Sequence, residues 1–103
     1  MKIVFGPQFN EDLRTIWEYI AQDSPEAADR VCHSVRATIA LLADFPEMGP
    51  ACRNLPSDLE GVRQISVKHY SNYQIFYLAA PDAVRVLRIF HGARDFAALF
   101  EQE

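Results

Sequence analysis

Basic and titratable side chains that could act on a phosphodiester lie mostly in the last third of the sequence. Cleavage of RNA through its 2′-hydroxyl requires a general base, a general acid and cations that stabilise the charge of the phosphorane-like transition state. Histidine exchanges protons near neutral pH, and arginine and lysine supply positive charge. The candidates for these roles are Arg63, Lys68, His69, Arg88, His91 and Arg94.

The overall charge of the chain is unfavourable for a protein that binds nucleic acid directly. The net charge is −4, and residues 1–51 carry four basic against eight acidic side chains. Residues 62–94 hold five basic side chains against Asp82 alone. A non-specific nucleic-acid binder is usually basic overall, because contacts with phosphates supply most of its affinity. We therefore expect no direct sequence-specific binding of nucleic acid.

The sequence offers little support for metal, redox or membrane chemistry. Cys32 lies in a helical pattern and Cys52 in a loop, without a Cys-x-x-Cys pair or histidines at ligand spacing. We expect no metal, no cofactor and no disulfide, with Cys32 as a buried free thiol. No apolar run reaches the roughly 20 residues that span a bilayer, and the first residues do not resemble a secretory signal. These features predict one cytoplasmic domain over residues 1–103.

The elements that would position these side chains begin with a short strand and two helices. Residues 2–5 predict the strand. Apolar residues at spacings of three or four predict a helix from Phe9 to Ile20 and a second from Pro25 to Leu42. Ser24 can cap the second helix, whose first position suits proline, and Pro46 stops it because the residue before a proline leaves the α region. Such a short connection predicts an antiparallel helical hairpin.

The second half of the chain predicts a long loop and three strands. Residues 47–61 contain several glycines and prolines, which are typical of a loop. Apolar patterns predict strands at 63–69, 73–78 and 84–90. We expect a turn at Ser71-Asn72 between the first two of these strands.

The last predicted strand has apolar residues on both faces. Val84, Val86 and Phe90 lie on one side, and Leu87 and Ile89 on the other, so we expect this strand inside the sheet. The order β-α-α-β-β-β lacks βαβ alternation and predicts an α+β fold. The N-terminal strand joins a largely antiparallel four-stranded sheet, the helical hairpin packs on one face, and a short C-terminal tail follows. The other face is left to solvent or a partner.

Short motifs follow one another along the chain from residue 12 to residue 95. They are Ile16-Trp17-Glu18-Tyr19-Ile20-Ala21, Ser24-Pro25-Glu26-Ala27-Ala28, Leu42-Ala43-Asp44-Phe45-Pro46, Gly61-Val62-Arg63, Tyr73-Gln74-Ile75-Phe76-Tyr77 and Val86-Leu87-Arg88-Ile89-Phe90-His91-Gly92-Ala93-Arg94-Asp95. Their order and separation resemble the ParE family of the RelE/ParE superfamily. The His-Gly-x-Arg-Asp ending is the most specific part of the resemblance.

The resemblance implies a type II toxin that a small ParD-like antitoxin neutralises in a toxin–antitoxin hetero-oligomer. ParE proteins are associated with poisoning of DNA gyrase, whereas their RelE relatives cut messenger RNA on the ribosome. RelE-type nucleases have a strongly basic sheet face and usually a tyrosine or histidine near the carboxyl terminus. This chain has only Phe96 and Phe100 there, and its net charge is acidic. We expect a gyrase inhibitor and not an enzyme. The alternative that the resemblance implies is ribosome-dependent cleavage of messenger RNA, with Arg63, Arg88 and His91 as catalytic residues.

The expected antitoxin surface combines tyrosines with basic strand residues. Tyrosine gives contact area at low entropic cost, and basic residues would match an acidic antitoxin segment. The antitoxin would dock as an amphipathic helix or as an added strand. The expected antitoxin-binding residues are Tyr19, Arg63, Lys68, Tyr70, Tyr73, Arg85 and Arg88. The expected target contacts come from the tail, through Arg94, Phe96, Leu99 and Phe100.

Structural roles are an equal alternative for several of these residues. The arginines would then pair with Asp58, Glu60 or Asp95 and hold the last strand. His91 is expected to pack and form hydrogen bonds rather than to catalyse. Trp17 follows the apolar stripe of its helix and is expected in the core. A relative that binds an antitoxin but inhibits no target would have the same sequence features.

Overall fold

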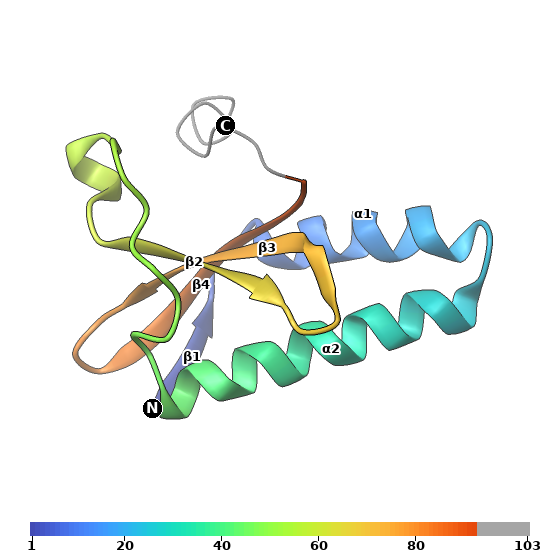
Figure 1. Ribbon diagram of the computed structural model, residues 1–103, viewed down its shortest axis with the longest axis horizontal. Coiled ribbons are helices and arrows are strands. Elements are labelled where there is room, and N and C mark those ends of the chain that lie inside the picture. The colour runs from blue at the N-terminus through green and yellow to red at the C-terminus, as the bar shows by residue number, and fades with distance from the viewer. Residues whose placement is uncertain (93–103) are drawn as a thin grey trace.

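A computed structural model describes residues 1–92 and confirms the order β-α-α-β-β-β (Figure 1). The elements are β1 (Lys2–Phe5), α1 (Phe9–Ala21), α2 (Pro25–Asp44), a 3₁₀ turn (Ser57–Leu59), β2 (Val62–Val67), β3 (Tyr70–Ala79) and β4 (Ala83–His91). The expected C-terminal tail lies outside the described residues. In the part of the chain that is described, no helix is long and apolar enough to cross a membrane.

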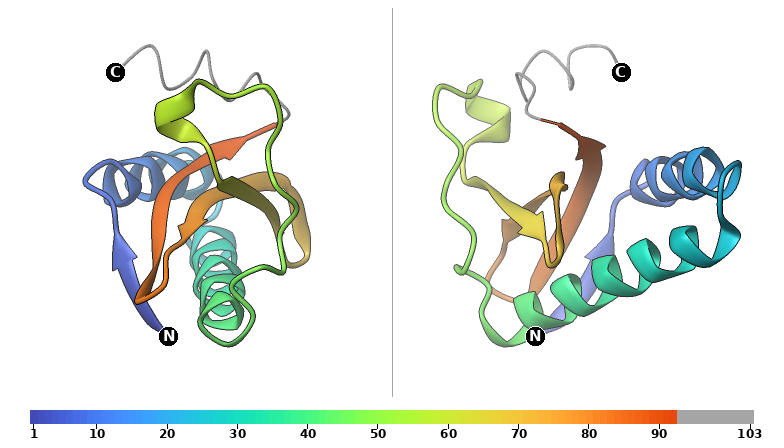
Figure 2. Two further views of the ribbon diagram at one scale, coloured as in Figure 1. Left: turned by 90° about the vertical axis from the view of Figure 1, so that its left-hand side faces the viewer. Right: turned by 45° about the vertical axis from the view of Figure 1, so that its right-hand side comes forward.

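The four strands form one sheet in the order β1-β4-β3-β2. β1 runs parallel to β4, and β2, β3 and β4 are antiparallel neighbours. The sheet is therefore largely antiparallel with β4 inside it, as expected. Figure 2 shows both helices on one side of the sheet and the connection between α2 and β2 on the other side.

The helical hairpin forms because α2 begins immediately after α1 ends. Ser24 has an extended backbone, and its Oγ accepts a hydrogen bond from the amide of Ala27 at 3.1 Å, which satisfies one free donor of the first turn. Both helices bury an apolar stripe against the sheet. The buried side chains of this main core are Phe9, Val31, Val35, Ile39, Leu42, Val67, Ile75, Tyr77, Val84, Val86 and Ile89.

A β-bulge changes the faces of β4 that the sequence predicted. Val86 pairs with Tyr77, and Arg88 pairs with Phe76, the neighbour of Tyr77 on β3. Leu87 has no residue opposite it and is therefore the extra residue of the bulge. An inserted residue moves every later side chain to the opposite face. Ile89, not Phe90, therefore joins Val86 in the main core, and the expected face of Phe90 was wrong.

The turn between β2 and β3 also differs from the prediction. It lies at Lys68-His69, and Ser71 and Asn72 belong to β3. His69 adopts a φ of 71°, a left-handed conformation that is uncommon for residues other than glycine. The amide of Lys68 donates to Thr38 Oγ1 on α2 at 3.0 Å, which fixes the turn to the helix.

The connection from α2 to β2 covers part of the second sheet face. Val62 and Phe76 are buried there beneath loop and strand residues that include Leu55, Leu59 and Phe90. This second cluster occupies part of a face that the sequence left to solvent or a partner. The long loop thus contributes a small core of its own.

Candidate functional site

Arg63, a candidate catalytic residue, lies on the helix-facing side of β2 opposite Tyr77. Its Nη1 donates to the carbonyl oxygen of Gly49 at 2.8 Å and to that of Glu47 at 3.3 Å. A positively charged donor forms strong hydrogen bonds with carbonyl oxygens. Arg63 therefore holds the loop that follows α2 against the edge of the sheet.

Arg88 forms a two-point ion pair with Asp12 of α1. Nε donates to Oδ2 at 2.7 Å and Nη2 donates to Oδ1 at 2.9 Å, and both side chains are only 12% exposed. Asp12 Oδ2 also accepts the backbone amide of Ile89 at 3.2 Å. The pairing of β1 with β4 ends at Val86, so β1 does not reach the backbone amide of Ile89. The Asp12 carboxylate accepts that amide instead. Sequence patterns did not single out Asp12 as the partner of Arg88.

His91 ends β4 and lies opposite Tyr73. The two rings meet edge to face at 4.9 Å, as the packing role predicted. Arg63 and His91 are paired with positions of β3 four residues apart, which is about 13 Å along a strand. Arg63 and His91 therefore lie on different strands and are well separated along the sheet.

The outer sheet face holds neutral polar side chains beside an aromatic pair. Gln64 Nε2 donates to Gln74 Oε1 at 3.1 Å, and Gln74 Nε2 donates to Ser66 Oγ at 2.9 Å. Phe76 and Phe90 pack with their centroids 5.8 Å apart, and the guanidinium of Arg88 lies 4.6 Å from the Phe90 centroid. This arrangement resembles a small packed surface more than a site for phosphoryl chemistry, which needs cations and proton carriers.

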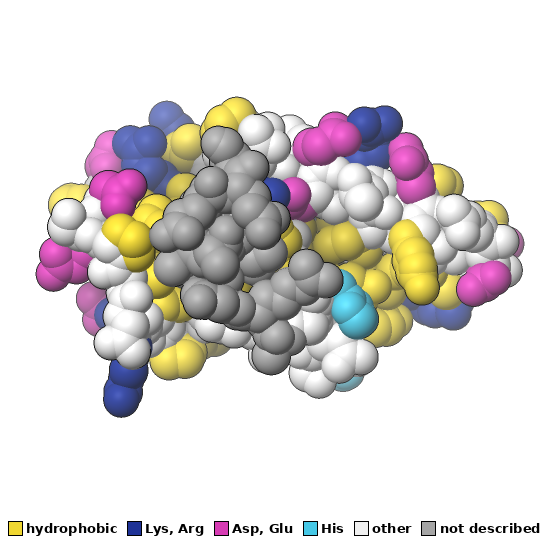
Figure 3. All heavy atoms as spheres, turned by 90° about the horizontal axis from the view of Figure 1, so that it is seen from above, with side chains coloured by type: hydrophobic (Ala, Val, Ile, Leu, Met, Phe, Trp, Pro, Cys, Tyr) yellow, Lys and Arg dark blue, Asp and Glu magenta, His cyan; other side chains and the backbone are white. Residues whose placement is uncertain are grey.

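The structure brings two of the expected antitoxin-binding tyrosines together. Tyr19 of α1 is 68% exposed, and Tyr73 of β3 is half-buried. Burial raises the pKa of Tyr73, and the nearby Tyr19 phenol adds to the effect. Tyr19, Tyr73 and His91 form what we call the aromatic patch. Figure 3 shows hydrophobic side chains gathered beside a histidine on the face that includes α1.

The other expected binding residues are dispersed. Lys68 is exposed in the β2–β3 turn, with the half-buried Tyr70 two residues later. Arg85 is exposed on the outer side of β4, opposite Leu78. The expected target contacts Arg94, Phe96, Leu99 and Phe100 lie outside the described residues. The predicted set of antitoxin-binding residues is thus divided among both sheet faces and a turn.

An apolar groove between β1 and the two helices was not predicted from the sequence. Its volume is about 410 Å³, and Phe5 is 48% exposed beside it, with its ring 5.2 Å from that of Phe9. We call it the helical groove; its lining residues are Ile3, Phe5, Phe9, Asn10, Leu13, Val35, Arg36, Ile39 and Ala40. The apolar side chains come from three elements, so no local pattern marks the groove. The one local signal is Phe5, an aromatic residue on the helix-facing side of β1 that the core leaves partly exposed.

The described residues contain no cluster of metal ligands, and their two cysteines are poor nucleophiles. Among residues 1–92, no group of three or more histidine, cysteine, aspartate or glutamate side chains could hold a metal ion. Burial raises the pKa of both the Cys32 and the Cys52 thiol. A raised pKa keeps a thiol protonated, and a protonated thiol is a poor nucleophile. Trp17 is only half-buried, and its indole donates to Asp29 Oδ1 at 2.9 Å, so its expected place in the core was wrong.

Similarity to known proteins is found at the levels of family, sequence and fold. Residues 3–96 match the family described as ParE toxin of type II toxin-antitoxin system, parDE. Toxin RelE2 of Caulobacter vibrioides is 34% identical over 83 residues, which cover 81% of this chain and 85% of that protein.

Two solved structures share the fold. A structure of the chromosomal ParDE toxin–antitoxin system from P. aeruginosa has a TM-score of 0.71 at 19% identity, covering 90% of this chain and 97% of the other. The isolated E. coli RelE toxin has a TM-score of 0.57 at 12% identity, covering 98% and 94%. The family match spans most of the chain, and the fold agrees with it. The chain therefore belongs to the ParE family of toxins of type II toxin–antitoxin systems, within the RelE/ParE superfamily.

Proposed function

We propose that this toxin acts by binding DNA gyrase, and not by cutting RNA itself. The observation that carries the proposal is the placement of the candidate catalytic residues. Arg63 binds loop carbonyl groups, Arg88 binds Asp12, and His91 packs on Tyr73 some distance from Arg63. A ribonuclease needs its proton carriers and cations around one phosphate. We infer gyrase as the target from the resemblance to ParE proteins. A toxin that binds gyrase would act in the cytoplasm.

We infer that a ParD-like antitoxin neutralises the protein by laying an amphipathic helix into the helical groove. A helix with apolar residues at spacings of three and four fits an apolar groove of this kind. The solved relative from P. aeruginosa belongs to a ParDE system, which supports a partner of this class.

Addition of an antitoxin strand to the outer edge of β2 is less well supported. The chain's own loop already pairs with that edge. The backbone amide of Gln64 donates to the carbonyl oxygen of Pro50 at 3.0 Å, and the backbone amide of Cys52 donates to the carbonyl oxygen of Val62 at 2.9 Å. Only the far part of β2 is left for a partner strand, and a short pairing contributes few hydrogen bonds.

The contact with gyrase is proposed to come from the tail, through Arg94, Phe96, Leu99 and Phe100. Three apolar side chains lie close together in the sequence near the chain end. Aromatic and arginine side chains are common at the centres of protein interfaces. Truncation after Asp95 should therefore remove toxicity and leave antitoxin binding intact.

The direct test uses purified protein, gyrase and supercoiled plasmid. The full chain should increase the amount of linear, gyrase-bound DNA, and the chain truncated after Asp95 should not. Circular dichroism should show the same helical content in both proteins. If the full chain leaves gyrase-mediated cleavage unchanged while arresting growth in cells, the target is another molecule.

The ribonuclease alternative rests on the fold likeness to the isolated RelE toxin. It predicts that His91→Ala abolishes toxicity without loss of folding. His91 is exposed at the end of its strand, so its removal should leave the core intact. Our proposal predicts that the H91A protein still promotes gyrase-mediated DNA cleavage.

A further inference from the structure

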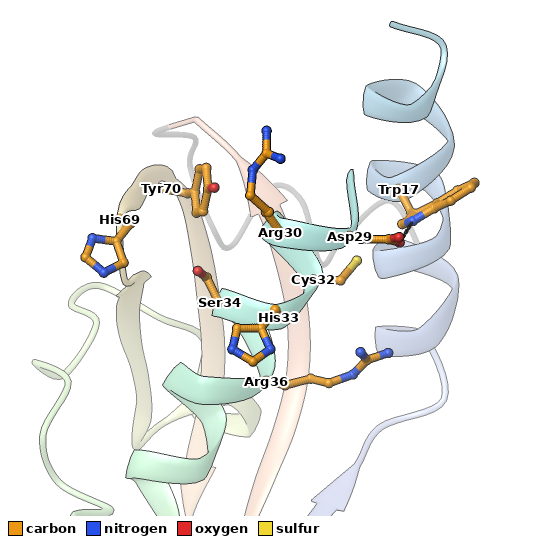
Figure 4. Close-up of a pocket in the computed structure, with 9 residues that line it drawn as sticks. All are labelled: Trp17, Asp29, Arg30, Cys32, His33, Ser34, Arg36, His69 and Tyr70. Atoms are coloured by element: carbon orange, nitrogen blue, oxygen red, sulfur yellow. Dashed lines mark hydrogen bonds between the residues drawn. The ribbon is translucent and has the colours of Figure 1, made fainter. Parts of the chain in front are cut away.

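A pocket of about 620 Å³ lies over α2, with α1 on one side and the β2–β3 turn on the other. We call it the basic pocket; it is lined by Trp17, Asp29, Arg30, Cys32, His33, Ser34, Arg36, His69 and Tyr70. Figure 4 shows Asp29, Cys32 and Arg36 on the side of α1. Arg30 and Ser34 lie on the side nearer to His69 and Tyr70. Only Arg36 is shared with the helical groove.

The lining of this pocket is positive although the whole chain has a charge of −4. Arg30 and Arg36 carry full positive charges, and the rings of His33 and His69 add N–H donors. Asp29 is the one acidic residue of the lining, and its Oδ1 already accepts the indole N–H of Trp17. The hydroxyl groups of Ser34 and Tyr70 add neutral donors. The pocket therefore offers several donors for an anionic group.

Backbone contacts fix the β2–β3 turn relative to α2 in this pocket. The helical period places Arg30 and Ser34 on the flank of α2 that faces the turn. The amide of Lys68 donates to Thr38 Oγ1 on the same helix at 3.0 Å. His69 and Tyr70 follow directly in the chain. A binding site built on a helix and on a turn tied to that helix needs little ordering when a ligand arrives.

We propose that the basic pocket binds the carboxylate side chains of a short acidic segment of a partner protein. The proposal rests on the toxin–antitoxin function and deepens it, since the partner would be the antitoxin. A long polyanion such as RNA would be repelled by the acidic remainder of the chain, whereas a short segment meets only the pocket. The acidic segment was expected at Arg63, Lys68, Arg85 and Arg88. The proposal places it at α2 and the β2–β3 turn, which keeps only Lys68 of these four near the site.

The test is an NMR titration of the full chain with a synthetic peptide that contains four consecutive glutamates. The amides of Ser34 and Tyr70 and the indole N–H of Trp17, which is the one tryptophan of the chain, should shift in a saturable way. The same peptide with four glutamines should cause no shifts. Inorganic phosphate forms a second arm. If phosphate binds more tightly than the glutamate peptide, the assignment to carboxylates is wrong.

Two matched charge removals separate the pocket from general attraction. Arg30→Gln should weaken peptide binding about tenfold, because it removes a charge-assisted partner of a carboxylate. Arg53→Gln removes the same charge from an exposed loop residue outside the pocket lining, and should change the affinity less than twofold. Both arginines are exposed, so both variants should fold. Equal losses in the two variants, or no saturable binding to the wild-type chain, would overturn the proposal.

Failure of this proposal is distinguishable from failure of the toxin function. Growth arrest and gyrase-mediated DNA cleavage by the free toxin do not involve the peptide. If the toxin is active and the glutamate peptide fails to bind, the basic pocket alone is wrongly assigned. If the peptide binds but antitoxin affinity is equal for the wild type and R30Q, the pocket does not serve the antitoxin and the proposal is wrong.

Discussion

Asp12 connects α1 to β4 through one carboxylate. It comes from the first turns of α1, binds the guanidinium of Arg88 at two points, and accepts the amide of Ile89. Most of this contact is shielded from water, since both side chains are 12% exposed. Removal of one partner from such a pair leaves the other charge unpaired in a poorly solvated position. Asp12 therefore helps to fix α1 on the sheet.

Substitution of Asp12 by alanine should lower the free energy of unfolding by about 3 kcal/mol. The matched control is Glu11→Ala, at the residue before Asp12. This change removes the carboxylate that forms an exposed ion pair with Arg14. That change should have a much smaller effect, because water screens exposed pairs. Urea denaturation followed by circular dichroism measures both. Similar midpoints for D12A and E11A would contradict a structural role for the buried pair.

Tyr77 makes the stability of the protein depend on pH at the alkaline end. Its side chain is fully buried, and burial raises the pKa of the phenol, although a hydrogen bond from the Gly49 amide opposes this. The folded protein therefore binds the phenolic proton more tightly than the unfolded chain does. Stability is complete below the unfolded pKa of about 10 and decreases as the pH rises beyond it.

The Tyr77→Phe variant separates this titration from the rest of the chain. It leaves the buried Gly49 amide without its acceptor, so it should lose about 1–3 kcal/mol at neutral pH. Its unfolding midpoint should then fall less steeply than that of the wild type between pH 9 and pH 11. A residual decrease is expected, because the pKa of Tyr73 is also raised. Parallel pH profiles for the two proteins would contradict the role of Tyr77.

At the scale of the elements, the loop after α2 is attached to the sheet through a close approach at Gly49. A methyl group at Gly49 would lie 2.6 Å from the carbonyl oxygen of Gln64 and 3.0 Å from the hydroxyl oxygen of Tyr77. The loop also receives the two hydrogen bonds of Arg63. Only glycine allows the backbone to come so near to β2.

Gly49→Ala should therefore destabilise the fold by about 2 kcal/mol through overpacking. Gly6→Ala is the control, because its added methyl group would lie 3.4 Å or more from its neighbours, near ordinary contact distance. Thermal unfolding compares the two variants. Equal melting temperatures would mean that the loop is not held closely against β2.

Sequence patterns predicted the elements well where one local rule governs them. The Ser24-Pro25 start of α2 and the apolar stripes of both helices are local signals, and both appear in the structure. The extra residue at Leu87 and the turn at Lys68-His69 were missed. A bulge depends on pairing with a neighbouring strand, and the left-handed His69 depends on the contact of the turn with α2. Neither requirement is visible in the sequence of one segment.

At the scale of the whole molecule, the contacts and surfaces described above depend on residues that lie far apart in the sequence. The resemblance to ParE proteins predicted the toxin family and the fold. The sequence could not predict that Arg63 faces the helix side of the sheet or that Asp12 reaches Arg88, because these contacts join segments far apart in the chain. The helical groove and the basic pocket likewise combine residues from separate elements. Only tertiary packing brings those residues together.

A substitution in the helical groove should separate toxicity from neutralisation. Phe5→Glu places a charge beside the groove and should weaken antitoxin binding at least tenfold, because an apolar helix face cannot pair with it. Toxicity without antitoxin should be unchanged. Phe45→Glu is the matched control, since Phe45 is 59% exposed and lies outside the groove lining. Binding by calorimetry and co-expression growth assays compare the two; equal losses would contradict the docking site.

The most direct test of the central claim is induced expression of the toxin, with plasmid DNA breakage and messenger RNA cleavage followed in the same culture within minutes. Binding to gyrase predicts broken DNA and intact messages. Cut messages with intact DNA would contradict this function and would place Arg88 and His91 at the centre of a ribonuclease mechanism.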